Sequence, residues 1–224
     1  MNFRNFTRKI KNLLVKKEKG QHEMEYWQKI KEREGELSNL HYQFFYTEHF
    51  DLSYEFYKGK RVLDIGCGPR GSLEWAHNTT ERVGLDPLAD EYLTLGASFH
   101  KMKYCASGSE SIPYPDNYFD IVTSFNSLDH VDDLEKTINE IKRIVKQQGL
   151  FLLLSDVNHE PTPCEPICFS WDIVKKFEPE FEIVQEHHFE KKEGMYQSIN
   201  ESKPYDHQKK TVRTGIISVK FKRI

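Results

Sequence analysis

Short apolar runs, separated by polar segments, dominate the middle of the chain. Five of these runs lie near residues 61–65, 82–86, 102–105, 120–125 and 150–155. Each is bounded by Gly, Pro, Asn or Asp, as is typical of buried strands. Two further runs, at 181–184 and 214–222, lie on either side of a long polar segment. The pattern therefore predicts seven strands.

Helical periodicity is clearest between the fourth and fifth of these strands. Over residues 132–147 the apolar side chains share one stripe, and a glycine follows at position 149. The stripe consists of Leu134, Ile138, Ile141, Ile144 and Val145. A second helix is predicted over residues 171–177. Strands that alternate with helices predict an α/β fold with a doubly wound, mainly parallel sheet.

Residues 1–20 have a different pattern. Phe3, Phe6, Ile10 and Leu13 recur at helical spacing among basic side chains, and Gly20 is expected to end this helix. Two interpretations stay open: a helix docked on the core with a solvated basic face, or an interfacial helix in contact with anionic lipid. The aromatic-rich residues 21–58 are predicted to form a helical cap or lid, and residues 59–224 the main domain.

The most informative local feature is a glycine-rich turn after the first strand. Residues 62–71 read VLDIGCGPRG and residues 83–87 read VGLDP. Gly66 and Gly68 let the chain turn sharply and its amides approach a ligand. Asp86 follows Gly66 by twenty residues, the distance to a ribose-binding acid in a βαβ nucleotide site. Asp64 would repel a pyrophosphate but suits a ligand with an ammonium and a sulfonium.

At these residues the chain resembles the class I S-adenosylmethionine-dependent methyltransferases, in particular the subfamily that mostly acts on small molecules. Residues 62–68 match the first motif of the family and residues 84–86 match the second. Residues 110–122 (ESIPYPDNYFDIV) resemble the third, and residues 126–131 (NSLDHV) resemble the fourth. Four ordered motifs arise by chance far less often than one glycine pattern. The resemblance covers residues 60–157.

The resemblance implies a Rossmann-like, seven-stranded sheet with an antiparallel last strand, a helical N-terminal cap, and S-adenosyl-L-methionine as cofactor. Asp86, followed by Pro87, would accept both ribose hydroxyls, because a carboxylate has two oxygens with spare lone pairs. Asp64 would hold the methionine part of the cofactor together with the amides of Gly66, Cys67 and Gly68. Cys67 is interpreted as a small residue whose backbone faces the ligand, not as a nucleophile, because the sequence places no base beside it.

The third motif departs from the family pattern at the position that usually carries an acid for the adenine amino group. This chain has Gly108 there. The adenine contact is therefore assigned to Ser109 or to Glu110. Asn126 follows the fourth strand, where relatives contact the methionine part of the cofactor, and its amide can both donate and accept.

His130 is the candidate catalytic residue, because an imidazole can take a proton from a hydroxyl or an amine as the methyl group is transferred. The alternative is a structural role at the start of a helix, with in-line orientation of the reactants supplying most of the catalysis. Asn158 and His159, in the proline-rich loop after the fifth strand, are the candidate substrate contacts. No metal is expected, because the Cys164 and Cys168 pair lacks a second pair of ligands.

Composition narrows the function further. The net charge of −3 over 224 residues gives no general attraction to nucleic acid, so DNA is not an expected partner. No apolar run approaches the roughly 20 residues needed to span a bilayer. Four cysteines are too few for a disulfide scaffold. A cytoplasmic location is expected, with membrane association through residues 1–20 as a second hypothesis.

The sequence therefore predicts a methyltransferase that transfers a methyl group from S-adenosylmethionine to an oxygen or nitrogen of a small molecule or glycan-type acceptor. Two alternatives remain: an RNA or protein methyltransferase, and a cofactor-binding regulatory subunit without catalysis. An intact glycine turn with Asp64 and Asp86 favours cofactor binding but does not distinguish these functions.

Overall fold

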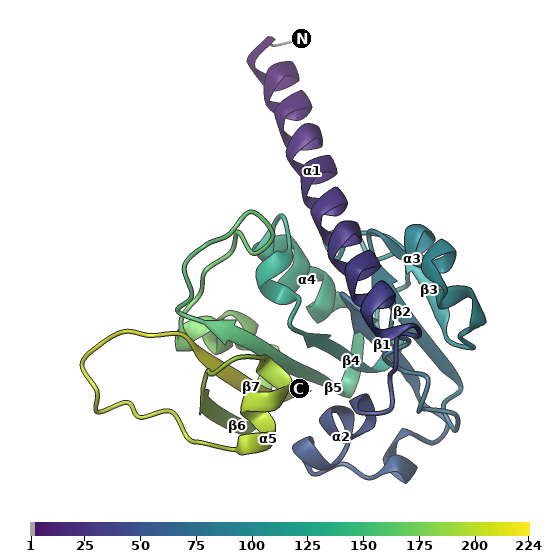
Figure 1. Ribbon diagram of the computed structural model, residues 1–224. Helices are drawn as coiled ribbons and strands as arrows, with labels where there is room; N and C mark the ends of the chain where they lie inside the picture. The colour runs from purple at the N-terminus through teal and green to yellow at the C-terminus, as the bar shows by residue number, and fades with distance from the viewer. Residues whose placement is uncertain (1–2) are drawn as a thin grey trace.

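One seven-stranded sheet organises the protein (Figure 1). The computed structural model describes the backbone of residues 3–224 and the side chains from Lys19 onward. The strand order is β3-β2-β1-β4-β5-β7-β6. The strands are β1 (Arg61–Ile65), β2 (Glu81–Asp86), β3 (Lys103–Ala106), β4 (Phe119–Phe125), β5 (Val145–Val157), β6 (Phe181–Glu190) and β7 (Gly215–Arg223).

The pairing of the strands confirms the predicted Rossmann-like topology. β1 lies in parallel between β2 and β4, with Leu63 opposite Val83 and Val122. β7 pairs antiparallel with both β5 and β6, as the resemblance implies. Gly215 at the start of β7 lies opposite Val157 at the end of β5. The connection between β6 and β7 therefore emerges at the edge of the sheet where β5 ends.

Apolar side chains are buried on both faces of the sheet, as expected for parallel strands covered on two sides. Along β1, Val62 and Leu63 point to opposite faces and belong to different core clusters. Leu63 packs in a cluster with Ile138 of α4 (Leu134–Ile144), whereas Val62 packs in a cluster with Phe45 of α2 (Tyr42–Tyr46).

The two helices predicted from periodicity differ from the expectation, the first in length and the second in type. α4 begins where the Asp133 side chain accepts a hydrogen bond from the Lys136 amide, and it ends at Ile144 because Val145 already adopts an extended conformation. Trp171–Phe177 is a 3-10 helix instead of an α-helix. The other helices are α3 (Ala89–Leu95) and α5 (Met195–Glu201).

The predicted alternation of strands and helices is incomplete. Residues 66–80, between β1 and β2, form consecutive turns without an α-helix, and residues 107–118 also lack one. Side-chain hydrogen bonds join the first of these connections to neighbouring segments. The Glu74 carboxylate accepts the amides of Lys101 and Met102, and the Arg82 guanidinium donates to the Leu73 carbonyl.

A single long helix, α1 (Phe3–Glu34), precedes the sheet, so the expected helix end at Gly20 is wrong. A glycine inside a helix costs only about 1 kcal/mol relative to alanine and does not by itself break it. The absence of a side chain at Gly20 instead permits close packing, because a Cβ there would lie 3.2 Å from Leu88 Cδ2.

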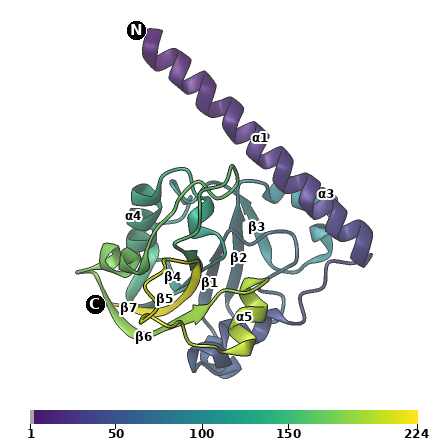
Figure 2. The ribbon, with the colours of Figure 1, turned by 60° about the vertical axis from the view of Figure 1, so that its left-hand side comes forward.

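Figures 1 and 2 show the first half of α1 extending away from the sheet and its second half lying beside α3 and the ends of β1 and β2. The predicted stripe of Phe3, Phe6, Ile10 and Leu13 lies outside the side chains that the structure describes. Within residues 3–224, no helix combines the length and hydropathy needed to cross a membrane.

Candidate functional site

A cavity of about 850 Å³ opens at the carboxyl ends of β1, β2 and β4. Ligands of open α/β sheets bind at this edge, where the strand order reverses. Ten of the predicted residues line the cavity: Asp64, Gly66, Cys67, Gly68, Asp86, Pro87, Ser109, Glu110, Asn126 and His130. The structure thus brings the four sequence motifs together around one space. The role of each residue in binding stays a prediction.

The glycine turn has the backbone that its sequence requires. Gly66 and Gly68 have φ values of +71° and +56°, a region that residues with a Cβ rarely adopt. A Cβ on Gly66 would lie 2.3 Å from the Ser127 Cβ, so β1 and the segment after β4 approach through this position. A Cβ on Gly68 would lie 3.2 Å from the Trp27 ring of α1. The turn is therefore enclosed from both sides.

Asp64 is a buried carboxylate at the inner wall of the cavity, with 2% of its surface exposed. It accepts hydrogen bonds from the hydroxyls of Thr123 at 2.6 Å, Tyr46 at 3.0 Å and Ser72. Burial raises its pKa to about 6, and these three hydrogen bonds act in the opposite direction. The network fixes the carboxylate in one orientation.

Asp86 occupies the end of β2 and is also largely buried. Its two oxygens accept the amides of Leu88 at 3.0 Å and Gly68 at 3.3 Å. Burial raises its pKa to about 6, against the effect of these two amides. The carboxylate therefore links the glycine turn to the end of β2 and has lone pairs left for a ligand.

Glu110 folds back over Gly108, which gives a structural reason for the glycine that departs from the family pattern. A Cβ at position 108 would lie 2.6 Å from Glu110 Oε2. The other oxygen of Glu110 accepts the amides of Asp132 and Asp133 just before α4. Ser109 also has an internal partner, because its hydroxyl lies 2.9 Å from the Thr137 hydroxyl. The adenine contact of either residue stays a prediction.

Cys67 is buried at the floor of the site. Its Sγ would lie 2.5 Å from a Cβ built on Gly84, so the thiol packs against β2. Burial raises its pKa well above the ordinary value, which disfavours the thiolate that a nucleophile needs. These observations support the interpretation that only the backbone of Cys67 contributes to the site.

Asn158 and His159 are not among the residues that line the cavity. The backbone N–H of Asn158 donates to the Phe169 carbonyl. The His159 ring lies beside Asp129, with its Nε2 3.6 Å from Asp129 Oδ2. The end of β5 contributes Asp156 to the wall, and the loop after β5 contributes Cys164 and Glu165. Binding of an acceptor by Asn158 and His159 stays a prediction.

The segment before β1 contributes residues that sequence patterns did not identify individually. Trp27 of α1 and Tyr42 and Tyr46 of α2 line the cavity. Arg70, after the glycine turn, holds α1 in place through an ion pair with Glu34 at 2.8 Å and a cation–π contact with Trp27. The only sequence signal was the general abundance of aromatic residues, which cannot separate packing from ligand contact. A lid function for residues 21–58 stays a prediction.

Residues 63–153 match the family model described as a methyltransferase domain. The chain is 34% identical over 101 residues to the uncharacterized methyltransferase YcgJ of Bacillus subtilis, covering 42% of this chain and 40% of that protein. It is 31% identical over 111 residues to the ubiquinone/menaquinone biosynthesis C-methyltransferase UbiE of Vibrio vulnificus, covering 43% and 41%. The chain thus spans about two fifths of the length of the curated relatives it matches.

The fold also matches solved structures. An S-adenosylmethionine-dependent methyltransferase from Mesorhizobium loti superposes with a TM-score of 0.55 at 15% identity, over 76% of this chain and 98% of that chain. At this identity the likeness shows the fold alone. The matched domain and the position of the cavity make residues 63–153 similar to the class I S-adenosylmethionine-dependent methyltransferases.

Proposed function

We propose that this protein transfers the methyl group of S-adenosylmethionine to an oxygen or nitrogen of a small molecule or glycan-type acceptor. The observation that carries the proposal is the pair of buried carboxylates, Asp64 and Asp86, at the ends of two neighbouring strands on one cavity. S-adenosylmethionine, the cofactor of the family, supplies an electrophilic methyl group on a sulfonium. The protein would bind and orient the two reactants.

The charges around the glycine turn fit this cofactor better than a dinucleotide. A pyrophosphate beside Asp64 would place like charges together in a region of low dielectric, whereas an ammonium and a sulfonium would be attracted to it. The Gly66 amide donates to the Leu85 carbonyl at 2.8 Å and the Gly68 amide donates to Asp86 at 3.3 Å, so these two amides hold the turn in place beside the cavity. Asp86 has the position and acceptor capacity for the ribose hydroxyls.

The size and the walls of the cavity support a small acceptor. Ligand pockets usually measure about 300–1,000 Å³, and 850 Å³ lies in the upper part of that range. It can accommodate the cofactor and a second small molecule. α1 and α2 enclose the cavity with Trp27, Tyr42 and Tyr46. Such enclosure excludes water and aligns the nucleophile with the methyl group and sulfur.

RNA or protein methylation remains the alternative within enzymes. The net charge of −3 does not favour a polyanionic acceptor. A catalytically inactive subunit is the alternative from another class, since cofactor binding alone would use the same carboxylates. Incubation with radiolabelled S-adenosylmethionine and pools of small hydroxyl and amine acceptors tests the proposal. Label appearing only in RNA or protein fractions would contradict it.

We expect S-adenosylhomocysteine to bind with micromolar affinity, about −8 kcal/mol. Its binding should raise the melting temperature, because it favours the folded state. NAD should neither bind nor raise the melting temperature, because its negatively charged pyrophosphate would be repelled by Asp64. Isothermal titration calorimetry measures the affinity for each compound, and thermal melts measure the change in melting temperature. Binding of NAD without binding of S-adenosylhomocysteine would overturn the cofactor assignment.

The raised pKa values of Asp64 and Asp86, both about 6, predict that affinity for S-adenosylhomocysteine falls below pH 6. Each carboxylate must then lose a proton to bind, which weakens binding by up to about tenfold per pH unit for each group. The stability of the folded protein without ligand has the opposite pH dependence. Carboxyls with raised pKa values contribute stability that is complete below their unfolded pKa and is lost as the pH rises through about 6.

Calorimetric titrations and thermal melts across this pH range measure both effects. The Asp86→Asn variant serves as the control, because it removes one of the two ionisable groups and should make the pH dependence of its residual binding less steep. An affinity that stays constant through pH 6 would contradict the assignment of these carboxylates.

We further propose that residues 1–20 contact anionic membranes. The support is the alternation of apolar and basic residues together with the extension of α1 beyond the sheet (Figure 2). The parent protein should sediment with vesicles that contain phosphatidylserine. Removal of residues 1–18, which leaves Lys19 and Gly20 at the cavity, should abolish sedimentation while S-adenosylhomocysteine binding persists. Parent protein that never sediments would leave only a packing role for this segment.

A further inference from the structure

Asp129 is a buried carboxylate without a hydrogen-bonding partner. It belongs to the 3-10 turn Leu128–His130 after β4, and its side chain is 1% exposed. Neither oxygen has a hydrogen-bonding partner among the described residues. An isolated charge in such a position is costly unless a counter-ion or a metal compensates for it.

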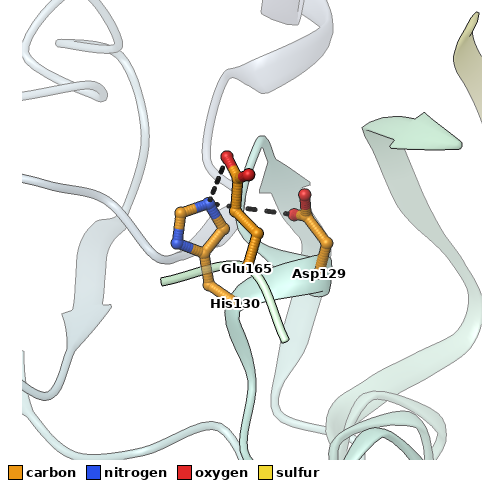
Figure 3. A group of neighbouring side chains, drawn as sticks. All are labelled: Asp129, His130 and Glu165. Carbon is orange, nitrogen blue, oxygen red and sulfur yellow. Dashed lines mark ion pairs between the residues drawn. The ribbon is translucent and has the colours of Figure 1, made fainter. Parts of the chain in front are cut away.

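The groups nearest to Asp129 are donors that commonly bind metals (Figure 3). His130 Nε2 lies 4.0 Å from Asp129 Oδ1 and 3.7 Å from Glu165 Oε1. These separations exceed the usual 2.7–3.2 Å of a hydrogen bond to nitrogen. Ligands bound to one ion at about 2.0–2.2 Å lie about 3–4 Å apart. The spacing therefore fits a shared cation better than direct contacts.

His159 adds a second, independent observation. Its Nδ1 lies 3.0 Å from the Glu160 carbonyl oxygen, which can only accept, so Nδ1 carries a proton. In the neutral ring Nε2 then has a lone pair, and this lone pair faces Asp129 Oδ2 at 3.6 Å. Two acceptors that face each other need a positive charge between them or a protonated ring.

Lysines near the cluster are directed elsewhere. Lys19 donates to the His130 backbone carbonyl and pairs with Asp132 at 3.9 Å. Lys191 pairs with Asp156 at 2.5 Å. Among the described side chains, the ion pairs of Asp129 and Glu165 are made only with histidines.

We infer that Asp129, His130 and Glu165 bind a divalent transition-metal ion, and that His159, beside the second oxygen of Asp129, helps to position this carboxylate. Imidazole and carboxylate donors together suit Zn²⁺ or Mn²⁺. His130 and Glu165 line the cavity, whereas Asp129 lies behind them. The open side of the ion therefore faces the proposed acceptor. If the proposed function holds, this site selects acceptors with an oxygen donor, such as a hydroxyl or carboxylate.

Titration of the metal-free, full-length protein with Mn²⁺, followed by electron paramagnetic resonance, tests the site without an activity assay. We expect one Mn²⁺ per chain, displacement by Zn²⁺, and an increase in melting temperature with either ion. Asp129→Asn and Glu165→Gln should each weaken binding at least tenfold. Glu160→Gln is the matched control, because Glu160 lies exposed in the same loop, and this variant should bind like the parent.

Absence of Mn²⁺ and Zn²⁺ binding in the parent would overturn the inference. Equal binding by the parent and Glu165→Gln would do the same, and this half-buried position decides the question if Asp129→Asn does not fold. S-adenosylhomocysteine binding is measured in every variant. Its retention with loss of Mn²⁺ supports the metal site, whereas its absence in the parent counts against the proposed function alone.

Discussion

Replacement of Asp86 by asparagine should lower the affinity for S-adenosylhomocysteine by about 30- to 1,000-fold. The side chain keeps its size but loses the negative charge of the carboxylate whose oxygens would accept hydrogen bonds from two ribose hydroxyls. Hydrogen bonds to charged groups contribute about 1.5–3 kcal/mol each. The total loss of about 2–4 kcal/mol corresponds to this decrease in affinity of about 30- to 1,000-fold. Calorimetry of parent and variant at pH 7.5 to 8, above the raised pKa of about 6, measures the difference.

Asp90→Asn provides the matched control for this experiment. Asp90 is an exposed carboxylate in the first turn of α3, four residues after Asp86, and it does not line the cavity. Its replacement changes the net charge equally but should leave binding intact. Similar affinities for Asp86→Asn and the parent would show that the ribose contact is assigned to the wrong residue.

The second large effect is expected at Gly66. Alanine at this position must adopt a φ of +71°, which costs about 1–2 kcal/mol, and its Cβ would overlap Ser127 at 2.3 Å. Overpacking of this kind adds about 1–3 kcal/mol. We expect Gly66→Ala to lower the free energy of unfolding by about 2–5 kcal/mol and to abolish detectable S-adenosylhomocysteine binding. Urea denaturation and calorimetry measure these two quantities.

Gly59→Ala separates backbone strain from overlap. Gly59 has nearly the same φ, +70°, but nothing lies within 4 Å of the position that an added Cβ would occupy, so only the strain of about 1–2 kcal/mol should appear. Adding Ser127→Gly to Gly66→Ala should recover part of the stability, because it removes the overlapping Cβ. Equal destabilisation by Gly59→Ala and Gly66→Ala would contradict the close approach of Ser127.

The sheet and the cofactor side of the site were predictable because their signals are local. A buried parallel strand is a short apolar run, and each run ends at the ligand-binding edge, so the residues that follow it converge there. This explains why Asp64, Asp86 and Asn126, which are far apart in sequence, line one cavity. The antiparallel position of β7 followed from the resemblance instead of from any pattern in its own residues.

The remaining features depend on contacts that periodicity does not encode. Gly20 has the composition of a helix end, but its packing against Leu88 favours a continuous α1. The turns after β1 are joined to segments far along the chain, because the Glu74 carboxylate accepts the amides of Lys101 and Met102 before β3. The cluster of Asp129, His130 and Glu165 was missed because Glu165 lies on another loop, and only the tertiary fold places it beside His130.

The antiparallel direction of β7 has a consequence for how acceptor specificity can diverge. Because β7 starts beside the end of β5, residues 191–214 are inserted at the cavity edge, and Lys191, Met195 and Tyr196 from this insertion form part of the wall. The insertion begins and ends on neighbouring strands that pair through their whole length. Residues 191–214 can therefore change in length and side-chain chemistry as one unit, while the cofactor side of the cavity, built from β1, β2 and β4, keeps its geometry.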